Sequence, residues 1–200
     1  MLTTHDRKLL TNAVRKSERS GNRRETCWWL LTGSPRSGKT TVARMLKDLG
    51  WHVIDDQGRV ELNAMTRHNS GPLDAKRNYL DFQFRVLGRY LSIQDSIDSR
   101  ERVVFDYGAS DALVFMKLAG IKWQEEFLQA AVGIRFERIF TFESLNERHE
   151  EIEDSHRLHD SAERSKLAEL FQDLYSSLGY DLKTVPKMSK TDRVNFILSQ

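Results

Sequence analysis

Short apolar runs alternate with amphipathic stretches along most of the chain. The apolar runs predict strands at 27–32, 51–54, 103–105, 136–142 and, more weakly, 180–185. The stretches between them predict helices that begin near Lys39, Gly58, Asp74 (extending to Arg100), Ala109, Trp123 and Arg157, and a final helix at 189–199. Strands and helices in alternation form parallel sheets with right-handed crossovers. We therefore expect a three-layer α/β fold, in which helices cover both faces of a mostly parallel five-stranded sheet.

The residues before the first strand form a separate feature. Residues 4–19 predict a short amphipathic helix, and the sequence Ser20-Gly21-Asn22 is expected to end it. Several Lys and Arg residues lie in this segment, which we interpret as a solvated helix and linker. We divide the chain into an N-terminal helix with a basic linker at 1–26 and one domain at 27–200.

Amino-acid composition limits the kinds of binding partner and the cellular compartment that we expect for this protein. The chain holds 31 Lys and Arg against 29 Asp and Glu, a net charge of +2, so its overall balance gives no reason to expect a nucleic-acid partner. Cys27 is the sole cysteine and cannot form an internal disulfide, which is typical of a reducing compartment. No apolar run approaches the roughly 18 residues of a membrane span, and the first ten residues lack an apolar signal-peptide core. We expect a cytoplasmic protein with no membrane partner, and oligomerisation stays open.

The end of the first strand carries the strongest chemical signal. Residues 33–40 match the phosphate-loop pattern G-x-x-x-x-G-K-[ST] at every fixed position, with a strand before and a helix after. Backbone N–H groups of such a loop surround phosphate oxygens, and the positive end of the helix faces them. Lys39 is expected to reach the β- and γ-phosphates, and Thr40 to ligate Mg²⁺. The predicted nucleotide-binding residues of this P-loop NTPase fold are Gly33, Ser34, Pro35, Arg36, Ser37, Gly38, Lys39, Thr40 and Thr41.

A carboxylate at the end of another core strand usually completes such a site. The apolar run 103–105 ends in Asp106, which we predict to act on the Mg²⁺ side, directly or through water. Two alternatives stay open. Asp106 caps the helix that begins near Ala109, or Asp111 takes the metal role instead of complementing the helix dipole.

Residues for the acceptor side are less sharply defined. The second strand ends in Asp55 and Asp56, at the sheet edge where ligands of α/β proteins bind. A carboxylate there can accept the proton of an attacking hydroxyl, and it can equally cap the following helix. We favour Asp55 slightly as the catalytic one. Arg77, Gln83 and Arg85 are further candidates for the acceptor pocket.

The polar segment 144–160 follows the fourth strand and lacks Gly and Pro, as expected of a lid over the phosphates. It contains Arg148 and Arg157, and Arg164 follows in the next helix. We choose Arg157 as the residue that contacts phosphate during transfer, against the alternative of surface ion pairs. Three histidines of this region do not predict a zinc site, because nothing else in the sequence completes one.

These residues, in this order, resemble a known family. The similarity is carried by LLTGSPRSGKTTVARMLKDLGWHVIDD, YLDFQFRVLGRY, VVFDYGASDALVFMKLAG, IFTFESL and DSHRLHDSAERSKLAELFQDLYSSLGYDLKTVP, within about residues 27–198. The chain resembles AAA-type ATPase domains related to the ribosylnicotinamide kinase domain of the NAD regulator protein, and its loop is similar to that of small nucleoside and nucleotide kinases. The resemblance implies binding of ATP or GTP, with Lys39 and Thr40 at the phosphates, Asp106 near Mg²⁺ and Arg157 near the phosphates.

Two positions depart from the family pattern. Such domains commonly have Asp-Arg-Gly after the third strand, whereas this chain has Asp106-Tyr107-Gly108. The missing arginine would help to bind acceptor or phosphate, so the usual acceptor chemistry is in doubt. Arg36 stands where these kinases often have Gly. Its guanidinium can contact a phosphate or another subunit, or face solvent.

The leading hypothesis is a kinase that transfers the γ-phosphate of ATP, with Mg²⁺, to an unidentified nucleoside, nucleotide or related metabolite. Tyr107 and the basic N-terminal helix favour an alternative, a nucleotide-dependent switch or slow NTPase that acts on a protein partner. A third hypothesis is a module that binds nucleotide without turnover. No N/T-K-x-D segment for reading guanine is present, which favours ATP and leaves GTP as the alternative.

The substitution Lys39→Ala tests the loop under all three hypotheses. We expect it to abolish triphosphate binding, because it removes the cation that faces the β- and γ-phosphates. Calorimetric titration with Mg²⁺–ATP measures the loss, and Lys8→Ala in the N-terminal helix is the control. Wild-type affinity in Lys39→Ala would exclude the loop as the binding site.

Overall fold

Five parallel strands form the central sheet, in the order β3-β4-β2-β6-β7. Their bounds are β2 Trp29–Thr32, β3 His52–Ile54, β4 Val103–Asp106, β6 Arg138–Phe142 and β7 Lys183–Val185. The computed structural model describes residues 1–67, 72–143 and 161–200. Because β2 lies between β4 and β6, the loop that follows it opens at the middle of the carboxyl edge of the sheet.

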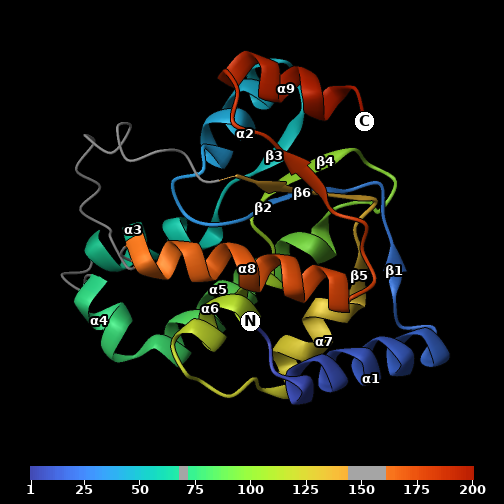
Figure 1. The fold of residues 1–200 in the computed structure, drawn as a ribbon, viewed down its shortest axis with the longest axis vertical. Coiled ribbons are helices and arrows are strands. Elements are labelled where there is room, and N and C mark those ends of the chain that lie inside the picture. The colour runs from blue at the N-terminus through green and yellow to red at the C-terminus, as the bar shows by residue number, and fades with distance from the viewer. Residues whose placement is uncertain (68–71, 144–160) are drawn as a thin grey trace.

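Helices cover both faces of this sheet (Figure 1). Their bounds are α1 Thr4–Ser20, α2 Lys39–Asp48, α3 Gln57–Arg67, α4 Pro72–Arg77, α5 Tyr79–Ser96, α6 Asp111–Leu118, α7 Glu125–Gly133, α8 Ser161–Ser177 and α9 Lys190–Leu198. Helices α2 and α9 lie on one face, and α1, α5, α6, α7 and α8 lie on the other (Figure 1). The expected three-layer α/β fold with a parallel five-stranded sheet is confirmed.

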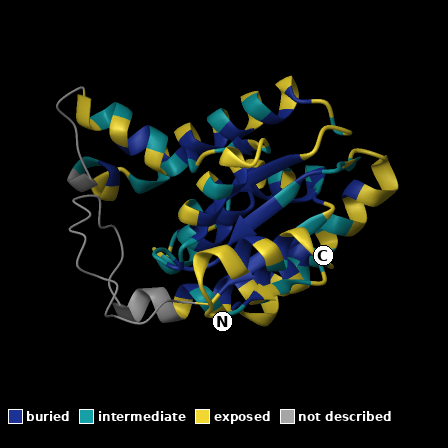
Figure 2. Ribbon diagram, turned by 90° about the horizontal axis from the view of Figure 1, so that it is seen from above, coloured by how far each residue is buried: buried dark blue, intermediate teal, exposed yellow. Residues whose placement is uncertain are grey.

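The core consists of two apolar clusters separated by the sheet. Successive strand residues point to opposite faces, so Leu30 joins the larger cluster and Leu31 the smaller one. The larger cluster lies under α5 to α8, and the smaller one packs Val42 of α2 against Val194 and Ile197 of α9. The strands are therefore buried between helices whose outer faces are exposed (Figure 2). Burial on both faces explains why the strands read as continuous apolar runs.

Helix α1 is anchored to the larger cluster by both apolar and polar contacts. Leu10 is fully buried there. The Asp6 carboxylate forms an ion pair with Lys117 Nζ of α6 at 2.7 Å, and the Leu2 backbone N–H donates to Asp173 Oδ2 of α8 at 2.9 Å. The N-terminal helix predicted at 4–19 is confirmed, and it shares the core of the domain that follows.

The segments around the last two predicted strands differ from expectation. The strand expected at 136–142 begins at Arg138. Just before it, β5 (Ile134–Arg135) pairs in parallel with β1 (Arg24–Glu25) as a separate two-stranded sheet. Two-residue strands that contain charged side chains have no periodicity to detect. The last strand is confirmed in a shorter form that begins at Lys183.

The long helix expected from Asp74 to Arg100 is wrong in its extent. It is divided into α4 and α5 at Asn78, whose φ and ψ of −114° and 48° are not helical. The second part ends at Ser96, four residues before Arg100. Apolar periodicity continues across such a break, because the two helices bury neighbouring faces. Within the described ranges, no helix has the length and apolarity needed to cross a bilayer.

The packing of α1 generates a stability prediction. We expect Leu10→Ala to lower the free energy of unfolding by about 2–5 kcal/mol, because it leaves a cavity in the larger cluster. Lys8→Ala on the exposed face of the same helix should change it by less than about 0.5 kcal/mol. Urea titration followed by circular dichroism measures both. Equal stability of the two variants would contradict the shared core.

Candidate functional site

The loop between β2 and α2 has a backbone that requires glycine at both ends. Gly33 has φ 120°, and a Cβ there would lie 3.1 Å from the backbone nitrogen of Phe142 and 3.2 Å from its oxygen. Gly38 has φ 91° at the N-terminus of α2. L residues with a side chain rarely adopt these angles, so the two fixed glycines of the motif are explained by this geometry.

Lys39 folds back over the loop that precedes it. Its Nζ donates to Gly33 O at 3.0 Å, to Ser34 O at 2.7 Å and to Ser37 Oγ at 3.1 Å. The side chain is 3% exposed. Burial lowers the pKa of the Lys39 ammonium to about 8, although the charges of nearby carboxylates, Asp106 first, oppose the shift. The buried ammonium of Lys39 is therefore hydrogen-bonded to two backbone carbonyls and one hydroxyl of the loop.

Thr40 and Asp106 meet beside this cation. The Thr40 hydroxyl donates to Asp106 Oδ2 at 2.6 Å, while Asp106 Oδ1 is buried and has no hydrogen-bond partner within residues 1–67, 72–143 and 161–200. Burial raises the pKa of Asp106, and the charge of Lys39 and the bond from Thr40 oppose that rise. A carboxylate oxygen without a donor, next to a hydroxyl, suits a hard cation such as Mg²⁺.

The alternative in which Asp106 caps α6 does not match this geometry. Its carboxylate faces Thr40, whereas the backbone N–H of Gly108 bonds to Asp111 Oδ2 at 2.7 Å. Asp111 Oδ1 also accepts the hydroxyls of Thr32 at 2.7 Å and Tyr175 at 2.6 Å. Burial raises the pKa of Asp111 to about 6, and these hydrogen bonds oppose the rise. Asp111 thus joins β2, the β4–α6 turn and α8, a network that the sequence did not indicate.

Tyr107 is the departure from the family pattern with the clearest structural effect. Its φ is 65°, and its hydroxyl donates to Gly33 O at 2.8 Å. Its ring centroid lies 4.3 Å from Lys39 Nζ, which is a cation–π distance. Arg36, the second departure, has φ 63° and so adopts the left-handed conformation that glycine takes without strain. Tyr107 therefore holds the first residue of the loop and its lysine from the β4 side.

The two carboxylates after β3 have different surroundings. Asp56 Oδ1 accepts the backbone N–H of Gly58 at 2.9 Å and that of Arg59 at 3.3 Å, so it caps α3. Burial and the charge of Asp106 raise the pKa of Asp56 to about 6. Asp55 is exposed. Arg59 was not predicted from the sequence as a site residue, yet its charge lowers the pKa values of Lys39, Asp56 and Asp106.

Several other candidates lie away from the loop or beyond the described ranges. Arg148 and Arg157 fall in 144–160, outside the described residues, as do the three histidines, and the side chain of Arg164 is likewise not described. Gln83 is buried. Arg85 pairs with Asp81 at 3.1 Å and with Glu61 at 3.8 Å. In the described part of the chain, no three His, Cys, Asp or Glu side chains form a metal site of their own.

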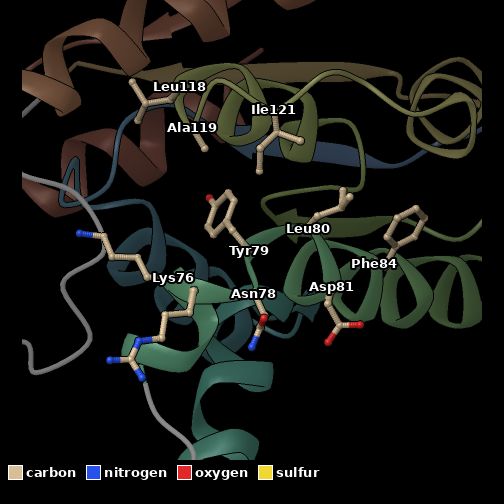
Figure 3. A pocket seen from close by; sticks show the side chains of 10 residues that line it. Lys76, Asn78, Tyr79, Leu80, Asp81, Phe84, Leu118, Ala119 and Ile121 are labelled. Atoms are coloured by element: carbon tan, nitrogen blue, oxygen red, sulfur yellow. The ribbon is translucent and has the colours of Figure 1, made fainter.

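A cavity of about 710 Å³ opens on another part of the molecule, between the start of α5 and the end of α6 (Figure 3). Its lining residues are Lys76, Arg77, Asn78, Tyr79, Leu80, Asp81, Phe84, Leu118, Ala119 and Ile121. Arg77, an acceptor-side candidate, is among them. None of the ten belongs to the loop or to the carboxylates around it, so the cavity and the Lys39–Asp106 site are distinct.

Comparison with known proteins agrees with the loop geometry. A family model described as an AAA domain matches residues 28–193. Among curated proteins, no sequence is significantly similar to this chain.

Solved structures with a similar fold include two of deoxyadenosine kinase from M. mycoides. The one with bound dATP has a TM-score of 0.65 at 16% identity and covers 86% of this chain and 97% of that chain. The one with dCMP and dCDP has a TM-score of 0.61 at 15% identity, covering 86% and 96%. Thymidylate kinase from Ehrlichia chaffeensis has a TM-score of 0.57 at 12% identity, covering 88% and 97%. At such identities the similarity shows a shared fold.

The different surroundings of the two buried carboxylates predict different effects on stability. Asp111→Asn should lower the free energy of unfolding by about 1–3 kcal/mol, because an amide cannot accept from three donors at once. Asp106→Asn should lower it by less than Asp111→Asn does, since the amide oxygen still accepts from Thr40 and the cost of burying the carboxylate disappears together with its attraction to Lys39. Urea titrations without nucleotide test both, and equal losses would contradict the distinction.

Proposed function

The chain belongs to the AAA domain family, and from that premise we propose that it is a P-loop kinase that transfers the γ-phosphate of ATP, with Mg²⁺, to a small molecule of the nucleoside or nucleotide class. The observation that carries the proposal is the meeting of Lys39, Thr40 and Asp106 at one end of β2. A cation for the β- and γ-phosphates and two oxygen ligands for a metal are thereby adjacent. The similarity to kinase structures supports the same class of reaction.

Triphosphate binding in this proposal uses groups that bond to one another within the loop. The three donors of Lys39 Nζ bond to Gly33 O, Ser34 O and Ser37 Oγ. We infer that Lys39 exchanges at least one of these bonds for a phosphate oxygen, while Tyr107 retains its bond to Gly33 O. The ammonium then stabilises negative charge on the phosphates from a site that excludes water.

Thr40 and Asp106 would hold the metal in this proposal. The partnerless Asp106 Oδ1 supports a metal ligand, and the Thr40 hydroxyl next to it supplies the second oxygen. Two protein oxygens are enough, because Mg²⁺ in such sites keeps several waters and phosphate oxygens. When bound, Mg²⁺ neutralises charge on the β- and γ-phosphates.

The acceptor would lie beside Asp55 and Asp56, at the carboxyl end of β3. Burial and the charge of Asp106 raise the pKa of Asp56 to about 6. This supports the assignment, because a carboxyl that titrates near neutrality is suited to general-base work. Asp55, which the sequence favours, is the exposed alternative. We assign Arg59, at the start of α3, to the binding of an anionic acceptor. Arg157 remains the proposed cation of the lid.

A second function is favoured by one observation. Tyr107 stands where the domains that this chain resembles commonly have arginine, and it contacts the loop rather than offering a charge to an acceptor. A slow NTPase that switches a protein partner would need the loop, Lys39 and Asp106 but no acceptor-binding arginine. The two functions differ in whether the phosphate goes to a small molecule or to water.

Product analysis separates the two functions. The protein is incubated with Mg²⁺–ATP and a pooled library of nucleosides, nucleotides and related metabolites, and phosphorus NMR follows the products. A phosphoester resonance that is absent with Lys39→Ala establishes the kinase and identifies the class of acceptor. Lys39-dependent release of free phosphate alone would favour the switch, and no Lys39-dependent change would contradict both.

Turnover of Asp106→Asn tests the metal-side assignment. We expect triphosphate affinity to stay within about tenfold of wild type, because the loop and Lys39 are intact, while turnover falls by at least about 100-fold. Single-turnover measurement of ADP formation, with calorimetry for affinity, separates binding from chemistry. Asp48→Asn, at the exposed end of α2, is the control. Turnover at the wild-type rate in Asp106→Asn would show that Asp106 does not act on the metal.

A further inference from the structure

A buried arginine of the last helix contacts the phosphate loop. Arg193 of α9 is 2% exposed, and its Nη1 donates to Ser37 O at 2.6 Å. The contact joins residues that are 156 positions apart in the sequence. Helix α9 is held in place by the smaller apolar cluster, in which Val194 and Ile197 pack with residues of α2. The guanidinium is therefore fixed against the loop by the packing of two helices.

This hydrogen bond sets the orientation of one peptide of the loop. In a trans peptide the C=O and the N–H point in opposite directions. Because Arg193 holds the Ser37 carbonyl on the α9 side, the N–H of Gly38 in the same peptide points the other way. A phosphate loop binds anions through such N–H groups, and a carbonyl turned towards the anion would repel it. Arg193 thus keeps the repulsive end of this peptide away from a bound phosphate.

The unliganded protein gains little stability from this arginine. Among the residues that the structure describes, its buried Nε and Nη2 have no hydrogen-bond partner, and its Cζ lies 5.8 Å from the centroid of the Phe142 ring. Burial lowers the pKa of Arg193, and the charge of Glu143 opposes this effect. One neutral acceptor and one aromatic ring offset only part of the cost of burying a cation. A polyphosphate in the adjacent loop would supply the compensating charge.

We propose that Arg193 is a positioning residue for triphosphate binding, which orients the Ser37–Gly38 peptide and places a buried positive charge behind the phosphate loop. The inference rests on the proposed function and deepens it, because it makes triphosphate affinity depend on the C-terminal helix. The ligand class is a polyphosphate anion, free or as part of a nucleotide. Arg193 touches the loop rather than the reacting atoms, so it acts through the loop.

The test compares Arg193→Met with Arg193→Lys in the full chain. For Arg193→Met we expect a melting temperature without ligand within about 4 °C of wild type, but at least about tenfold weaker binding of Mg²⁺–ATP and of inorganic tripolyphosphate. Arg193→Lys keeps a charge and one donor, so it should recover most of the lost affinity. Lys190→Met, on the exposed side of the same helix turn, should bind like wild type. Calorimetry and thermal scans give both quantities.

Each outcome of this test either supports the proposed role of Arg193 or overturns it. An Arg193→Met protein that is unfolded, or much less stable without ligand, would show that the arginine supports the fold and would overturn the inference. A stable Arg193→Met protein with wild-type affinity would also overturn it. In either case, tight Mg²⁺–ATP binding by wild type and its loss in Lys39→Ala would leave the proposed function intact. Failure of wild type itself to bind triphosphate would reject the proposed function together with the inference.

Discussion

The burial of the Lys39 ammonium among loop carbonyls and nearby carboxylates is the interaction on which the site depends. The cation is 3% exposed and uses its three donors on the loop itself, so the loop closes around its own lysine. Desolvation of this charge is costly and is offset by Asp106, Asp56 and Asp111. Burial raises the pKa of each of these carboxylates, and the charge of Lys39 opposes the rise in all three. A bound polyphosphate with its metal would add both signs of charge to this arrangement and keep it balanced.

The order of the strands brings these charges together. Because β2 pairs with β4 and Leu31 is in register with Asp106, the end of β4 lies beside the beginning of the loop. Tyr107 and Asp111 follow within one turn and bond to Gly33 and Thr32 respectively. The C-terminal helix approaches from the opposite side of the loop through α2. Hydrogen bonds from the β4 side therefore fix the loop, and Arg193 contacts it from α9.

The sequence predicted those parts of this arrangement that depend on local pattern. The α/β layers follow from apolar runs and amphipathic stretches, and the phosphate loop follows from a motif whose two glycines have positive φ. Asp106 followed from its place after an apolar strand. The break at Asn78, the pairing of two-residue strands and the three bonds to Asp111 depend on contacts between distant segments. Arg193 has no sequence signal at all, because a basic residue in an amphipathic helix ordinarily faces solvent.

The central claim is that Lys39, Thr40 and Asp106 form one site for a metal-bound triphosphate. A crystal structure of the protein with Mg²⁺ and a non-hydrolysable ATP analogue tests it most directly. The account predicts phosphates enclosed by residues 33–40, with Lys39 Nζ on phosphate oxygens and the metal next to Thr40 and Asp106. A nucleotide bound instead in the cavity beside α4 and α5, or a metal that Asp106 does not approach even through water, would contradict it.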